Sequence, residues 1–127
     1  MTELEWTQML NHFVHLGIAF LLAVPVAVNR ELRSKGVGLR TFPLVSVASC
    51  GYMLLAMQVY SGSDAEARVM YGLITGIGFI GGGAILKNGS NVSGTATAAS
   101  IWNTGAIGVS VAYSYYEIAI TLSLINF

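Results

Sequence analysis

Uncharged stretches divide this chain of 127 residues into segments whose lengths match membrane-spanning helices. A hydrocarbon core about 30 Å thick needs about 20 apolar residues of α-helix. The first uncharged interval, residues 6–29, has 24 residues, and the second, residues 41–63, has 23. A third, residues 69–86, has 18 residues and is rich in glycine, and a fourth runs over about residues 94–113. The pattern therefore predicts four full spans.

The last ten residues, 118–127, follow Glu117 and are mostly apolar. At 1.5 Å per residue they form about 15 Å of helix, which is too short to complete a crossing. We therefore expect an all-α, polytopic transmembrane bundle with four full spans and a truncated fifth helix. Residues 1–127 are expected to form a single transmembrane domain.

The composition supports a membrane protein and excludes several other classes. Hydrophobic residues make up 54% of the chain and charged residues 9%, whereas charged residues make up about 25% of a typical soluble domain. This excludes a disordered chain and an ordinary cytosolic enzyme. The formal net charge is zero, so no basic surface attracts nucleic acid. Cys50 has no second cysteine to pair with and is expected to be a small buried side chain.

The basic residues predict the orientation of the chain in the membrane. Five of the six lie in the connections that follow the first and third spans. They are Arg30, Arg33, Lys35, Arg40 and Lys87. Because short loops rich in Lys and Arg stay in the cytoplasm, both connections are expected there and the N-terminus in the periplasm. Only Arg68 is expected on the opposite side.

The glycine-rich third span contains a literal match to the dinucleotide-binding fingerprint, over residues 76–81. That motif needs a preceding strand and an acidic residue about 20 positions further on, and residues 95–105 contain no acid. Small residues four apart in an apolar helix instead allow a second helix to approach closely. Gly78 and Gly82 should therefore bring the third and fourth spans, or two copies of the chain, together. The candidate packing residues are Gly72, Gly76, Gly78, Gly81, Gly82, Gly83, Gly94 and Ala98.

Three motifs occur in order along the chain, "NREL…GLRT", "TGIGFIGGGAIL" and "NVSGTATAASIWNTGAIG". On the basis of these motifs, residues 10–120 resemble the MgtC/SapB family, and the third span is most similar to the YhiD-like branch of that family. The resemblance implies a multi-pass protein of the bacterial inner (plasma) membrane with about five helices and a periplasmic N-terminus. Members usually continue into a small cytoplasmic C-terminal domain, which is expected to be absent here.

The resemblance also implies a function, which is a regulatory role in adaptation to magnesium limitation and acid stress through other membrane proteins. In some members the partner is the F-type ATP synthase. Expected partners are membrane lipids, other integral membrane proteins and further copies of the chain, but no nucleic acid. The alternative is a magnesium transporter or channel, although Mg²⁺ prefers carboxylate ligands and the four spans contain no Asp or Glu.

An enzyme is not expected, and neither are catalytic residues, a cofactor or a metal site. Ser100 and His15 are the nearest approach to a nucleophile and base, and they are predicted near opposite sides of the bilayer or at different depths. His12 and His15 lie three residues apart on one helix face. They fit either a helix contact or a role in pH sensing or metal binding.

Several polar and charged residues are candidates for function. Where the family has Glu-Arg-Glu, this chain has Asn29, Arg30 and Glu31, and the missing carboxylate weakens any cation site there. Arg40 begins the second helix, whose N-terminus repels a cation, so Glu31, an anionic lipid or a phosphate is expected to compensate it. Alternatively, Arg40 needs no specific partner and its side chain extends to the lipid headgroups. The other candidates are Thr41, Asn91, Thr97, Trp102 and Asn103, and the last is expected to face the bundle interior.

Overall fold

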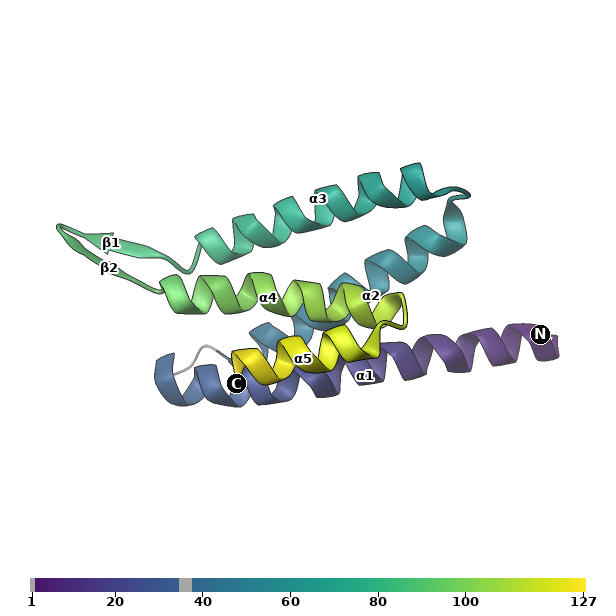
Figure 1. The fold of residues 1–127 in the computed structure, drawn as a ribbon, viewed down its shortest axis with the longest axis horizontal. Helices are drawn as coiled ribbons and strands as arrows, with labels where there is room; N and C mark the ends of the chain where they lie inside the picture. The colour runs from purple at the N-terminus through teal and green to yellow at the C-terminus, as the bar shows by residue number, and fades with distance from the viewer. Residues whose placement is uncertain (1, 35–37) are drawn as a thin grey trace.

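A computed structural model describes residues 2–34 and 38–127, which fold into a helical bundle with a small hairpin. The elements are α1 (Glu3–Ser34), α2 (Thr41–Val59), α3 (Ser63–Gly82), β1 (Leu86–Asn88), β2 (Asn91–Ser93), α4 (Thr95–Ala112) and α5 (Tyr116–Asn126). Successive helices run in opposite directions along one long axis (Figure 1). The described residues therefore form an up-and-down bundle, as the spacing of the uncharged stretches predicts.

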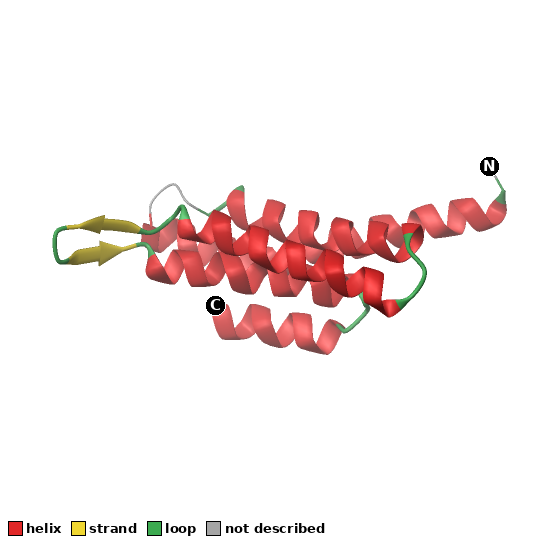
Figure 2. Cartoon of the chain, turned by 90° about the horizontal axis from the view of Figure 1, so that it is seen from above, coloured by secondary structure: helices red, strands yellow, loops and turns green. Residues whose placement is uncertain are grey.

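Two helices, over Glu3–Arg33 and Thr41–Val59, are long and apolar enough to cross a membrane. The first is longer than the predicted span, because 32 residues of α1 extend about 48 Å. Its N-terminal turns project past the neighbouring helices (Figure 2). The third helix begins at Ser63, six residues earlier than predicted, and so includes the charged residues Asp64, Glu66 and Arg68. Helix α5 has 11 residues and is the shortest, as expected.

Helix α4 lies at the centre of the bundle and packs against each of the other four helices. Two glycines allow its closest contacts. A Cβ atom at Gly108 would overlap the backbone carbonyl of Ser46 on α2, and one at Gly105 would overlap the side chain of Ile77 on α3. Phe42, Met53, Ile107 and Val111 are fully buried around this centre, together with Cys50, whose predicted burial is confirmed.

The predicted contact between α3 and α4 forms through Gly81, and not through Gly78 and Gly82. A Cβ atom at Gly81 would lie 3.1 Å from the carbonyl oxygen of Ala98, whereas one at Gly72, Gly76, Gly78 or Gly82 would meet no described residue within 4 Å. The rotation of α3 explains the difference, because Ile77 and Gly81, four residues apart, face α4. The other four glycines lie on open surfaces of the described bundle.

The connection between α3 and α4 is a hairpin, which the all-α prediction missed. Strands β1 and β2 pair antiparallel, with Leu86 opposite Ser93 and Asn88 opposite Asn91. The hairpin extends beyond the ends of the helices (Figures 1 and 2), and all six strand residues are exposed. Since neither face is buried, hydrophobic alternation gives no signal for it in the sequence. Gly83 lies just before it, and Gly94 follows with a φ of +84° that favours glycine.

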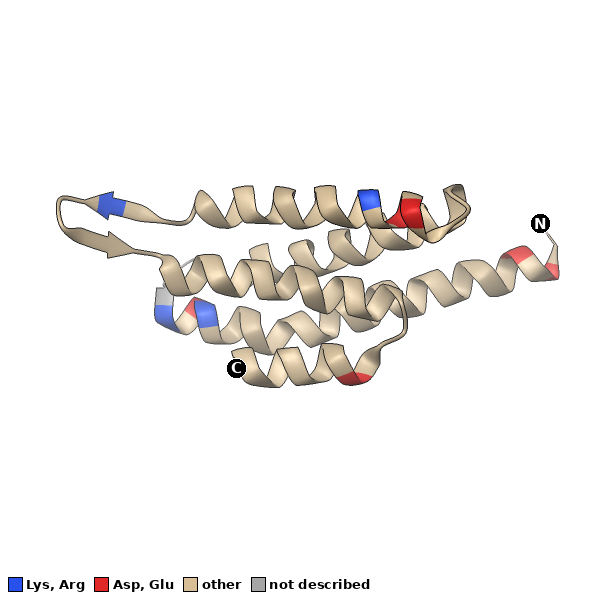
Figure 3. Cartoon of the chain, turned by 45° about the horizontal axis from the view of Figure 1, so that its top comes forward, with Lys and Arg blue, Asp and Glu red and all other residues tan. Residues whose placement is uncertain are grey.

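Charged residues gather at the two ends of the bundle (Figure 3). Arg30, Arg33, Arg40 and Lys87 lie in the elements of one end, as the sequence predicts. Arg68 lies near the other end, on the same helix as Asp64 and Glu66. Lys35, which belongs to the predicted basic loop, lies outside the described residues.

We predict that Gly81→Leu lowers the free energy of unfolding by about 1–3 kcal/mol, because the new side chain must push α3 away from Ala98. Gly82→Leu is the matched control, since it adds the same side chain where no described residue lies within 4 Å. Thermal unfolding of both variants in detergent measures the difference. Equal destabilisation by the two substitutions would contradict this packing of α3.

Candidate functional site

A partly buried polar cluster joins α4 to α5. The Nδ2 of Asn103 donates to the carbonyl of Leu122 at 3.3 Å and to Oδ1 of Asn126 at 2.8 Å. The Nδ2 of Asn126 in turn donates to Oγ of Ser100 at 3.0 Å. Asn103 thus faces α5, and its amide nitrogen is used in a helix contact.

Two serines fasten neighbouring helices to the backbone of α1. The hydroxyl of Ser46 on α2 donates to the carbonyl of Ala19 at 2.8 Å, and that of Ser123 on α5 donates to the carbonyl of Leu22 at 2.7 Å. Both serines are buried. Interhelical hydrogen bonds in lipid contribute about 0.6 kcal/mol on average. The polar groups of the interior therefore stabilise the association of the helices.

His15 connects α1 with the turn between α4 and α5. Its side chain is 6% exposed, and its Nδ1 lies 2.7 Å from the carbonyl oxygen of Asn11, so Nδ1–H donates. Its Nε2 then accepts from the hydroxyls of Ser114 at 3.0 Å and Tyr116 at 3.1 Å. Ser114 has a φ of +62°, a conformation uncommon outside glycine. Of the two alternatives for His15, this arrangement favours the helix contact.

A polar hollow of about 330 Å³ adjoins this contact. Gln8, His12 and Gln58 contribute to its lining. Within residues 2–34 and 38–127 there is no group of three or more His, Cys, Asp or Glu side chains that could hold a metal ion. The hydroxyl oxygen of Ser100 accepts a hydrogen bond from Asn126, whereas His15 contacts Asn11 and Ser114.

A second polar contact, between Tyr113 and Glu66, lies at the same end and joins α3 to the residue that follows α4. The hydroxyl of Tyr113 donates to Oε1 of Glu66 at 2.7 Å. Burial, together with the hydrogen bond to Glu66 and its negative charge, raises the pKa of Tyr113 to about 12. The neutral phenol is therefore favoured.

The candidates at the opposite end do not form the expected ion pair. Oε2 of Glu31 accepts from the backbone N–H of Leu39 at 3.4 Å, and within the described part of the chain no salt bridge joins Glu31 to Arg40. The Nη2 of Arg30 donates to Oδ1 of Asn29 at 3.1 Å, while its Nε is buried without a partner among the described residues. Arg40 is exposed and immediately precedes Thr41, the first residue of α2. Compensation of Arg40 by Glu31 is therefore not observed.

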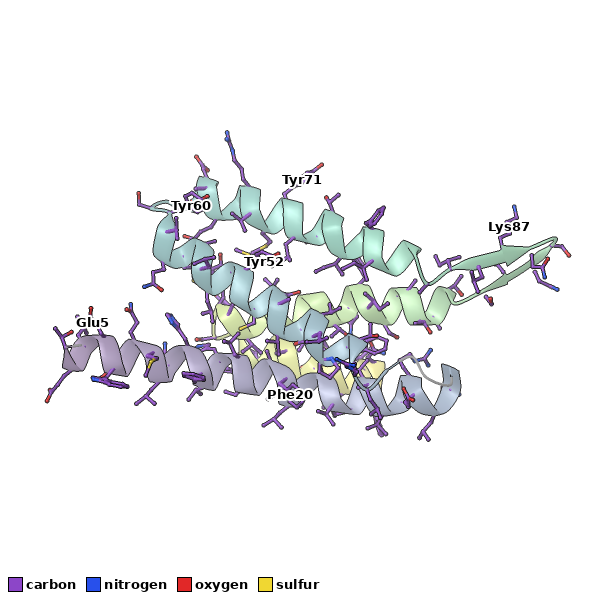
Figure 4. All side chains as sticks on the ribbon, turned by 180° about the vertical axis from the view of Figure 1, so that it is seen from behind. Glu5, Phe20, Tyr52, Tyr60, Tyr71 and Lys87 are labelled. Atoms are coloured by element: carbon purple, nitrogen blue, oxygen red, sulfur yellow. The ribbon has the colours of Figure 1, made fainter. Side chains whose placement is uncertain are left out.

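Grooves flank both sides of α3. One, of about 400 Å³, lies between α2 and α3 and includes Tyr52, Gly72 and Gly76, with Tyr52 directed into the space between the two helices (Figure 4). The other, of about 430 Å³, lies between α3 and the α4–α5 pair, and it includes Trp102 and Asn103. Both linings are predominantly apolar. The remaining candidates lie apart from both grooves: Thr97 is buried in the first turns of α4 and Asn91 is exposed on the hairpin.

Sequence reasoning missed several residues that hold the bundle together, namely Ser46, Ser123, Asn126, Ser114 and Gly108. A polar residue within an apolar span is a usable signal, since such residues face the bundle interior. That signal marks Ser46 and Ser123. It does not identify their partners, which are backbone carbonyls 27 and 101 residues away in the sequence.

Comparison with known proteins places these features in a family. The MgtC family profile matches residues 16–127. The protein named "Putative magnesium transporter YhiD" of Escherichia coli K12 is 34% identical over 115 residues, which covers 84% of this chain and 53% of YhiD. Protein MgtC of Brucella abortus strain 2308 is 38% identical over 104 residues, covering 82% of this chain and 43% of that protein.

Protein MgtC of Salmonella typhimurium strain 14028s is 32% identical over 117 residues, covering 92% of this chain and 50% of the relative. The chain thus spans about half the length of the curated relatives that it matches. No solved structure matches it.

We predict that one phenol titrates late in a spectrophotometric titration of tyrosinate, with a pKa of about 12, and that Tyr113→Phe removes it. A pKa raised in the folded state stabilises the fold below the unfolded value near 10, and this contribution is lost as the pH rises towards 12. The contact with Glu66 should therefore weaken over that interval. Tyr60→Phe is the control and should leave the late phase in place. Persistence of the late phase in Tyr113→Phe would contradict the assignment.

Proposed function

The chain belongs to the MgtC family, and from this premise we propose that it regulates adaptation to magnesium limitation and acid stress by binding other proteins of the bacterial inner membrane. Family membership and the names of the relatives support a magnesium-related membrane protein. The regulatory mode of action is our inference. The proposal includes no enzymatic activity and no cofactor.

The observation that carries this proposal is the backbone of α3 that the described bundle leaves uncovered, both in the groove beside α2 and on the rest of its exposed surface. A Cβ atom added at Gly72, Gly76, Gly78 or Gly82 would meet no described residue within 4 Å, and Phe79 between them is 85% exposed. Tyr71 points away from the bundle on the same helix (Figure 4). Glycines that leave the backbone accessible allow another membrane helix to pack closely, by van der Waals contact. A helix of a partner protein, or of a second copy of the chain, fits such a surface.

We propose four full crossings, by α1 to α4, with the N-terminus in the periplasm and α5 entering the membrane as a short fifth helix. The gathering of Arg30, Arg33, Arg40 and Lys87 at one end supports this orientation, because basic residues in short loops stay in the cytoplasm. The hairpin then projects into the cytoplasm. The contacts of His15 and of Tyr113 lie at the periplasmic end.

The second candidate function is transport of Mg²⁺, which the name of the relative YhiD favours. A path for this ion needs oxygen ligands, because Mg²⁺ loses its waters reluctantly. The amide of Asn103 and the hydroxyls of Ser46 and Ser123 could supply oxygens, but within residues 2–34 and 38–127 no group of three or more His, Cys, Asp or Glu side chains could hold a metal ion. A path without carboxylate ligands suits Mg²⁺ poorly, which makes regulation the better supported function.

We predict that the purified protein in liposomes takes up no Mg²⁺ above the level of empty vesicles. We also predict that Gly82→Leu abolishes growth of cells that depend on this protein at low magnesium, although it leaves the fold intact. The bulky side chain blocks the face of α3 without touching the rest of the described bundle. A fluorescent indicator of Mg²⁺ inside the vesicles measures uptake, and growth curves measure the phenotype.

Control substitutions separate the two functions. Thr121→Ala changes an exposed residue whose hydroxyl bonds within its own helix, and it should preserve growth. Uptake of Mg²⁺ that depends on the protein and is lost in Asn103→Leu would overturn the regulatory proposal and establish transport. Normal growth of the Gly82→Leu cells would contradict the proposal that α3 is the binding surface.

We predict that a cysteine at position 63 is labelled by an impermeant reagent on intact cells, whereas a cysteine at position 88 is not. Ser63→Cys lies at the end of the bundle proposed to face the periplasm, and Asn88→Cys lies on the hairpin at the other end. The Cys50→Ala background removes the native thiol. Permeabilised cells provide the control, in which both positions should react. Labelling of position 88 alone on intact cells would reverse the topology.

A further inference from the structure

A small groove at the basic end combines apolar side chains with one cation. It has a volume of about 210 Å³ and lies between α1 and the beginning of α2. Its lining consists of Phe20, Leu39, Arg40, Pro43 and Leu44. Phe20, which Figure 4 labels on α1, and Leu44 on α2 are both exposed. The groove therefore opens on the outer surface of the bundle, and its occupant has to match both apolar walls and a guanidinium.

The guanidinium of Arg40 is available to such an occupant. Within residues 2–34 and 38–127 its side chain makes neither a hydrogen bond nor a salt bridge. Glu31, the carboxylate nearest to it along the chain, accepts from the backbone N–H of Leu39 instead. Arg30 and Arg33, on the last turns of α1, add positive charge at the same end. The charge around the groove is thus complementary to an anion.

Arg40 also lies back from the tip of α1. Gly38 packs against the backbone of Ala27 and Glu31, and Ser46 lies against Ala19, so α2 begins beside the middle of the C-terminal half of α1. From Ala27 to Ser34, α1 continues for about 10 Å towards the basic end (Figure 1). An uncompensated cation at that depth, beside apolar side chains, is costly in a bilayer.

We propose that this groove binds one anionic phospholipid. The phosphate contacts the guanidinium of Arg40, and an acyl chain lies along Phe20, Pro43 and Leu44. The apolar walls select a lipid over free phosphate, which has no chain to fill them. The negative headgroup selects an anionic lipid over a zwitterionic one, whose own cation would be repelled by Arg30 and Arg33. The inference rests on the proposed placement in a membrane, and it is independent of the regulatory role.

Native mass spectrometry of the purified protein in detergent tests this site. The protein is supplied with phosphatidylglycerol or phosphatidylcholine of identical acyl chains. We expect one phosphatidylglycerol per chain to be retained in preference to phosphatidylcholine, and Arg40→Gln to weaken its binding about fivefold. Arg68→Gln is the matched control, because it removes the same charge at the opposite end of the bundle. It should leave lipid retention unchanged.

Two further measurements keep the test decisive. Arg40→Lys retains the charge and should retain the preference for phosphatidylglycerol. It replaces Arg40→Gln in the test if Arg40→Gln fails to fold. Leu44→Ala leaves Arg40 in place and should weaken binding of long-chain phosphatidylglycerol more than of a short-chain analogue. Equal retention of both lipids, an equal loss in Arg68→Gln, or displacement of the lipid by inorganic phosphate would overturn the proposal. A negative result in growth or Mg²⁺ flux would not affect it, since lipid binding is measured separately.

Discussion

Helices in a bilayer gain little from the hydrophobic effect when they meet, because lipid tails are as apolar as the side chains between them. Association then depends on close packing and on hydrogen bonds. In this protein the closest approach of two helices at a glycine is at Gly108, where the carbonyl of Ser46 occupies the space that a side chain would need. That contact joins α4 to α2, and α4 in turn contacts every other helix. The rest of the bundle is arranged around it.

The hydrogen bonds of the interior reinforce the same arrangement. Ser46, Ser123 and Asn103 each bond to the backbone of a neighbouring helix, so α2 and α5 are fixed to α1, and α4 to α5. Helix α3 packs against α2 and α4 but takes no part in these three bonds. Its outer glycines and aromatic side chains remain exposed. We therefore propose α3, whose outer glycines leave its backbone accessible, as the helix that binds another membrane protein.

The two ends of the bundle differ in chemistry. At one end, His15 and Glu66 each accept hydrogen bonds from residues at the α4–α5 turn, so the polar groups are paired. At the other end, among the residues that the structure describes, Arg40 faces a groove without a partner, and Nε of Arg30 is buried without one. An end with unpaired cations has the greater need for anions from its surroundings. In a membrane, phospholipid headgroups supply them.

The sequence by itself determined the number and approximate limits of the helices, because charged residues interrupt apolar stretches at intervals of membrane thickness. It also determined the family and the gathering of basic residues at one end. The tertiary structure alone decided that Gly81 contacts Ala98 while Gly82 is free, and that Asn103 meets Asn126. The hairpin was not predicted because its six strand residues are exposed on both faces, so they show no alternation of apolar and polar positions. The rotation of each helix about its axis could not be predicted, because a helix in lipid is apolar on its inner and outer faces alike. Hydropathy therefore does not reveal which face meets a neighbour.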